Sequence, residues 1–134
     1  LKLLQRNDYI CFCAYSPYDP RLEGLIQQVR AKVRDASQRA TMFGFGPRYL
    51  HSTGQLHKGG PNSCVIVLMT VDLADDVKIP GELFNFGQLE YAQALGDFQA
   101  LEAKERRVVH FHLRQPVIES FLEIQKLFDR ICEI

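Results

Sequence analysis

Residues 64–71, CVIVLMTV, form the most apolar stretch of the sequence and are the best guide to its fold class. A short run of this kind, without a charged residue and rich in valine, is typical of a strand that is covered on both faces. Residues 9–15, YICFCAY, are almost wholly apolar as well and predict a second buried strand. Such strands belong to sheets with helices on each side, and these sheets are mainly parallel.

A helix is predicted after the strand at residues 9–15. The sequence SPYDP that follows this strand is typical of a turn, with Asp19 as the helix N-cap and Pro20 at the first helical position. From Arg21 to about Gln38, apolar residues recur at spacings of three and four, with polar residues between them. This pattern is typical of a helix that packs one face against a sheet.

The remaining elements alternate in the same way. Further strands are expected at residues 40–45 and 107–113, and further amphipathic helices at residues 86–105 and 117–133. This alternation predicts an α/β fold, a three-layer sandwich with a mainly parallel sheet, in one domain that covers residues 1–134.

Composition and charge exclude several classes of function. The 134 residues are 46% hydrophobic and 24% charged, and the formal net charge is zero. A neutral chain has no overall field that attracts nucleic acid or an anionic membrane surface. No apolar run approaches the roughly 20 residues of a membrane span, and the first residues contain no signal-peptide cleavage site. We therefore expect a cytoplasmic protein that binds neither nucleic acid nor membranes.

The four cysteines predict buried thiols. Cys11 and Cys13 lie two apart on a predicted strand, so their side chains should point the same way, into the core. We interpret them as reduced thiols of a cytosolic protein. A Cys-x-Cys metal pair is the lesser alternative, because no second pair follows at a ligand spacing.

Residues 47–63, PRYLHSTGQLHKGGPNS, are predicted to be a long loop without a helix or strand of its own. The loop follows the strand expected at residues 40–45, so it leaves the carboxyl end of that strand. Ligands of parallel α/β sheets bind at these ends. Because loops of this length in a compact domain are commonly functional, we consider residues 47–63 a candidate binding site.

Two kinds of site are not expected there. Gly54 and Gly59 have the spacing of a P-loop, but Gly60 and Pro61 follow where lysine and serine or threonine are required. The histidines do not predict a metal centre either, because Zn²⁺ needs three or four ligands and few carboxylates lie near them in the sequence. The histidine pairs are His51 with His57, and His110 with His112.

The polar residues of the loop suit acid–base chemistry on a sugar phosphate. The imidazole of His51 can give and take a proton near neutral pH. Hydroxyl and amide groups beside it can bind a polyhydroxylated ligand, and two cations can bind an anionic group. These candidate substrate-binding residues are Ser52, Thr53, Gln55, Arg48 and Lys58. The alternative is a solvated loop without a function of its own.

The sequence LHSTGQ at residues 50–55 resembles the segment around the catalytic histidine of the phosphoglucose isomerase family. The longer run FGFGPRYLHSTGQLHKGGPNS, residues 43–63, is similar in particular to the isomerase part of fused transaldolase/phosphoglucose isomerase proteins. Residues 86–101 and 106–113 resemble that branch as well, so the similarity extends from about residue 8 to residue 113.

This resemblance implies a sugar-isomerase (SIS) fold and the interconversion of glucose 6-phosphate and fructose 6-phosphate, without a metal or an organic cofactor. It implies that His51 helps to open the sugar ring and that Gln55 lies nearby. The family's ring-opening lysine falls near Gln93, which cannot supply a proton. Either Lys58 or another group replaces that lysine, or the site depends on His51 alone.

The resemblance also implies that part of the site lies outside this chain. The family's catalytic glutamate, its arginine and its phosphate pocket belong to segments that precede the first strand. We therefore expect the C-terminal part of an SIS domain, which pairs with its missing upstream half and forms a homo-oligomer. The alternatives are a non-catalytic sugar-phosphate-binding module and a structural fragment whose loop packs against another subunit.

Overall fold

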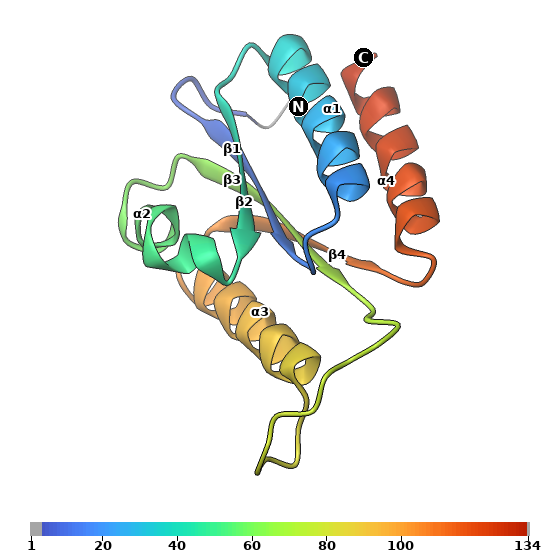
Figure 1. The fold of residues 1–134 in the computed structure, drawn as a ribbon. Coiled ribbons are helices and arrows are strands. Elements are labelled where there is room, and N and C mark those ends of the chain that lie inside the picture. Colours follow the sequence, from blue (N-terminus) through green and yellow to red (C-terminus); the bar gives the residue numbers. More distant parts are fainter. Residues whose placement is uncertain (1–3, 134) are drawn as a thin grey trace.

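A parallel sheet lies at the centre of the computed structural model, which describes residues 4–133 (Figure 1). Its strand order is β2-β1-β3-β4, and every neighbouring pair in the described part of the chain is parallel. The strands are β1 (Tyr9–Tyr15), β2 (Thr41–Gly46), β3 (Cys64–Val71) and β4 (Arg107–Leu113). The predicted α/β sandwich with a mainly parallel sheet is thereby confirmed.

Helices cover both faces of the sheet. Helix α1 (Pro20–Ser37) packs beside α4 (Val117–Cys132) on one face, and α2 (Thr53–Gly59) lies beside α3 (Phe86–Ala103) on the other (Figure 1). Right-handed crossovers put α1 on one face and α2 and α3 on the other, because the chain moves from β1 to β2 in one direction along the sheet and from β2 to β3 and β4 in the other. None of the helices within residues 4–133 is long and apolar enough to cross a membrane.

The alternation of side chains along β1 divides the core in two. Ile10, Phe12 and Ala14 face α1 and α4, whereas Cys11 and Cys13 face α2 and α3. Successive residues of a strand point to opposite faces, so a strand that is apolar throughout contributes to both cores. The prediction that the two cysteines point the same way, into the core, is confirmed.

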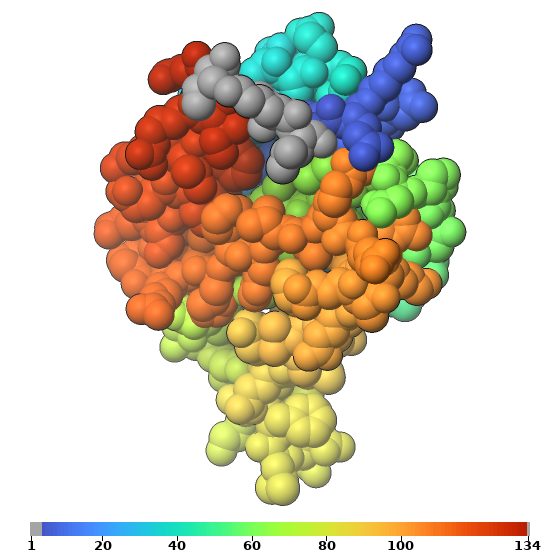
Figure 2. Space-filling view, turned by 180° about the vertical axis from the view of Figure 1, so that it is seen from behind, coloured from blue at the N-terminus to red at the C-terminus, as the bar shows by residue number. Residues whose placement is uncertain are grey.

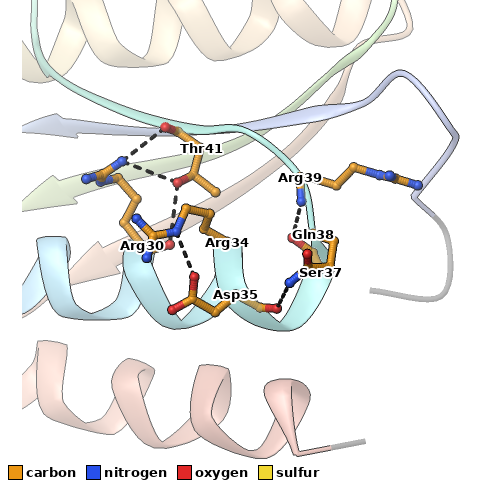
Figure 3. Close-up of polar contacts among 7 residues, drawn as sticks. All are labelled: Arg30, Arg34, Asp35, Ser37, Gln38, Arg39 and Thr41. Carbon is orange, nitrogen blue, oxygen red and sulfur yellow. Dashed lines mark hydrogen bonds and ion pairs between the residues drawn. The ribbon is translucent and has the colours of Figure 1, made fainter.

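Helix α1 is capped at both of its ends, and Figure 3 shows how its C-terminal end joins β2. Asp19 accepts hydrogen bonds from the backbone N–H groups of the first helical turn, as the sequence predicted for an N-cap. At the other end, Gln38 takes a left-handed conformation with φ 55°, and its N–H donates to the Arg34 carbonyl over 2.8 Å. The Arg30 guanidinium then donates to the Thr41 carbonyl over 3.1 Å and joins α1 to the first residue of β2.

The topology creates a switch point at the carboxyl ends of β1 and β3. The chain leaves β1 through α1 on one face of the sheet and leaves β3 through α3 on the opposite face. In open parallel sheets, the crevice that opens between such strands is the usual place for a ligand. The segment between β3 and α3 projects from this end of the molecule (Figures 1 and 2).

Candidate functional site

Residues 47–63 are not a loop, so that prediction was wrong. Arg48–His51 form a 3₁₀ turn, and Thr53–Gly59 form the helix α2. A helix this short is marginal by itself and needs tertiary contacts. Arg106 supplies one, because its guanidinium donates to the carbonyls of Lys58 and Gly60 over 2.8 and 2.9 Å and satisfies the end of α2. This partner is 46 to 48 residues away, so the local pattern of glycines and prolines did not indicate it.

A cleft opens where the carboxyl ends of β1 and β2 meet this segment. His51 and Arg48 both line it, and both are exposed. Its volume is about 410 Å³, and its other lining residues are Ser16, Tyr18, Phe45, Gly46 and Pro47. The structure therefore places two of the predicted site residues together at the strand ends, the position that was predicted from the sequence.

Ser16 is a lining residue that sequence reasoning missed. It directly follows β1, its side chain is almost fully buried, and its Oγ has no hydrogen-bond partner among residues 4–133. A second cleft of about 540 Å³ extends from Ser16 along the ends of β3 and β4. The signal that could have identified Ser16 was its position directly after a strand that ends at the switch point. Ser16 lines both clefts and so connects them.

The other candidates on the segment do not line the cleft. Ser52 Oγ donates to the Tyr49 carbonyl, and Gln55 Nε2 donates to the Leu50 carbonyl, each over 3.3 Å. Thr53 begins α2 and is half-buried. Gln93 is exposed on α3. None of these four residues lines the cleft, and Ser52 and Gln55 bind backbone carbonyls of their own segment.

Lys58 makes an ion pair instead of facing the cleft. Its Nζ lies 2.5 Å from Oδ1 of Asp97, a buried carboxylate on α3. Tyr49 donates a short hydrogen bond to the other oxygen of Asp97, and burial together with this carboxylate raises the pKa of Tyr49 above its ordinary value. The three groups join the 3₁₀ turn and α2 to α3. Lys58 is therefore bound as a structural cation, which argues against its replacing the family's lysine.

His57 is buried beside the cysteines of the sheet. Its Nδ1 lies 3.0 Å from the Tyr9 hydroxyl, and its Nε2 lies 3.4 Å from Cys11 Sγ. Cys11 Sγ is also 3.4 Å from Cys13 Sγ, and the thiols are free. The Cys13 thiol raises the pKa of Cys11, and the Cys11 thiol in turn raises that of Cys64. Sequence reasoning assigned no role to His57, because nothing local places it against the sheet.

The two histidines of β4 form a chain of hydrogen bonds with β3. Thr70 Oγ1 lies 2.8 Å from His110 Nε2 and 2.8 Å from His112 Nδ1, and His112 Nε2 lies 2.9 Å from Asp72 Oδ1. The hydroxyl has one proton, so it can donate to only one of the two rings and must accept from the other. His110 and His112 are two residues apart on β4, so both side chains lie on the same face of the sheet.

The His110 ring predicts a pH dependence of stability. Burial, and secondarily the His112 ring, lowers the pKa of His110. A histidine with a lowered folded-state pKa stabilises the fold fully above its unfolded pKa of about 6.5, and this contribution is lost as pH falls through the folded value. We expect the free energy of unfolding of His110→Gln to fall less than that of the wild type between about pH 7 and pH 5.

Chemical denaturation across this pH range measures the effect. His51→Gln, at an exposed histidine outside the network, is the matched control and should keep the wild-type dependence. If the free energy of unfolding changes with pH equally in His110→Gln and in the wild type, His110 contributes nothing to the pH dependence of stability.

Comparison with known proteins finds structures of similar fold but identifies no family for this chain. No family model and no curated protein matches this chain. A hypothetical protein from Thermus thermophilus superposes with a TM-score of 0.74 at 21% identity, over 91% of this chain and 34% of that protein. A de novo designed Rossmann fold protein gives a TM-score of 0.48 at 12% identity, over 90% of this chain and 96% of the design. The chain thus spans about a third of the Thermus protein, and at this identity the likeness concerns the fold alone.

Proposed function

We propose that this chain is the C-terminal part of a cytoplasmic glucose-6-phosphate isomerase and that His51 opens the sugar ring. The observation that carries the proposal is the placement of His51 and Arg48 in one cleft at the carboxyl ends of two parallel strands. The sequence resemblance of residues 50–55 supports the same role for His51.

The cleft has the chemistry that this reaction needs from one wall of its site. Ring opening moves a proton between the ring oxygen and the C1 hydroxyl, and an exposed imidazole can give and take it near neutral pH. A guanidinium such as that of Arg48 binds anionic oxygens. Ser16 lines the cleft beside His51 and Arg48, and its buried hydroxyl has no partner in the described part of the chain. No metal is required for any of these contacts.

The rest of the site, on this proposal, comes from an upstream half of the same protein and from its oligomer. Large exposed apolar side chains on and beside the projecting segment support this, because such side chains are commonly covered at an interface. Val77, Leu83, Phe84 and Phe86 are all exposed there. The edge strands β2 and β4 also leave backbone groups for another segment to cover.

One observation favours a second candidate, a sugar-phosphate-binding module without catalysis. The position that resembles the family's ring-opening lysine is Gln93, and Lys58 is already bound to Asp97. Such a module would keep the cleft and the cation while lacking a complete set of proton donors.

Isomerisation of fructose 6-phosphate by the full-length protein tests the proposal, with thermal stabilisation by the same ligand measured in parallel. Turnover supports the isomerase. Stabilisation by fructose 6-phosphate without turnover supports the binding module and overturns the catalytic role. Neither turnover nor stabilisation overturns both and favours a structural role for the segment.

A further inference from the structure

Three soft metal-ligand atoms converge in the core between the sheet and α2. The Sγ atoms of Cys11 and Cys13 and Nε2 of His57 all lie within 4.8 Å of one another. All three residues are at most 2% exposed. We propose that Cys11, Cys13 and His57 bind a Zn²⁺ ion through these three atoms.

The spacing of these atoms fits a tetrahedral Zn²⁺ ion. Zn–S bonds of about 2.3 Å and Zn–N bonds of about 2.0–2.1 Å put two sulfur ligands roughly 3.8 Å apart, and a sulfur and a nitrogen roughly 3.6 Å apart. The observed separations are 3.4 Å for Cys11 Sγ to Cys13 Sγ and 3.4 Å for Cys11 Sγ to His57 Nε2. An ion therefore needs shifts of only a few tenths of an ångström between these pairs.

The His57 ring is already held in the orientation of a metal ligand. The Tyr9 hydroxyl lies 3.0 Å from Nδ1, whereas Nε2 is the nitrogen that lies beside Cys11. When Nδ1–H donates to this oxygen, the lone pair of Nε2 faces Cys11. Metal-binding histidines in proteins commonly donate their other N–H to a fixed acceptor, which sets the tautomer and the ring plane.

The donor set selects the kind of ion. Thiolates and imidazole favour zinc over the oxygen-seeking Mg²⁺ and Ca²⁺, and cysteine and histidine are the usual ligands of zinc in proteins. Binding displaces the thiol protons of Cys11 and Cys13, and the two thiolates balance the charge of the ion. The surrounding side chains of this core, including Ile66, Leu68 and Ala94, are apolar.

The ion would have a structural role. It joins β1 to α2, which directly follows the 3₁₀ turn that carries His51. The cysteines come from the sheet and the histidine comes from a helix of seven residues that is marginal by itself. Zinc would therefore fix the segment that lines the cleft, while leaving His51 and the cleft free for a ligand.

Metal content of the full-length protein, purified under reducing conditions without chelator, tests the proposal. We expect about one zinc per chain, and, after exchange for Co²⁺, the absorption of a tetrahedral thiolate-bound cobalt ion. Added zinc should raise the Tm of chelator-treated protein in a concentration-dependent way. A folded wild-type protein that contains less than about a tenth of an equivalent of zinc, and that neither zinc nor cobalt affects, would overturn the site.

Variants assign the ligands. Cys13→Ser and His57→Gln should each lose at least tenfold in zinc affinity, consistent with the loss of a ligand. Cys132→Ser is the matched control, because Cys132 lies on α4 at the opposite face of the sheet, and it should bind zinc as the wild type does. Unchanged zinc binding in both ligand variants would contradict the assignment. If either variant fails to fold, the cobalt spectrum and the zinc-dependent Tm of the wild type still decide the question.

Discussion

His51→Gln is expected to lower the kcat for isomerisation of fructose 6-phosphate by the full-length protein by about 10²–10⁴-fold, the usual contribution of a positioned acid or base. Glutamine keeps a hydrogen-bonding side chain but cannot donate and accept a proton in turn. His51 is exposed in the cleft and packs little against the core, so the variant should fold normally. Steady-state kinetics measure kcat and KM separately, and we expect kcat to change and KM to stay close to the wild-type value.

His110→Gln is the matched control for this variant. It replaces a half-buried histidine of β4 that lies in the Thr70 network and outside the cleft. Its kcat near neutral pH should equal that of the wild type. An active wild type together with an unchanged kcat for His51→Gln would exclude His51 as the ring-opening group.

Lys58→Met is expected to destabilise the fold by about 3 kcal/mol, because it leaves a buried carboxylate without its counter-charge. Asp97 is 2% exposed at its side chain, and the Tyr49 hydroxyl would still donate to it but carries no charge to balance it. Asp97→Asn should cost less, since the Lys58 side chain is 24% exposed and can turn to solvent. Denaturant unfolding measures the loss of unfolding free energy in both variants. The loss is obtained from the shift of the denaturant midpoint when the slope is constant.

The double variant separates the ion pair from packing. Lys58→Met combined with Asp97→Asn removes the uncompensated charge, so it should be more stable than Lys58→Met alone. If Lys58→Met costs the same with and without Asp97, the two residues are not coupled and the ion pair contributes nothing.

The sequence alone determined the sheet and its large helices. The apolar runs at residues 9–15 and 64–71 predicted both central strands with the observed bounds, and the other elements shown agree to within two residues, except for residues 47–63. Asp19 predicted the start of α1 correctly. The period of the apolar residues and the helix caps can be recognised from residues a few positions apart. The period also indicates whether one or both faces of an element are buried. His51 and Arg48 at a strand end followed from the same reasoning.

The tertiary structure alone decided what the rest of residues 47–63 does. Arg106 satisfies the carbonyls that end α2, Asp97 binds Lys58, and Cys11 contacts His57. The partners in the first and last of these contacts are 46 to 48 residues apart in the chain. A glycine-rich segment without a clear period does not reveal which distant carboxylate, guanidinium or thiol will meet it. Only the packing of α2 between the sheet and α3 turns a predicted substrate cation into a buried ion pair and a loop histidine into a buried ring beside two cysteines.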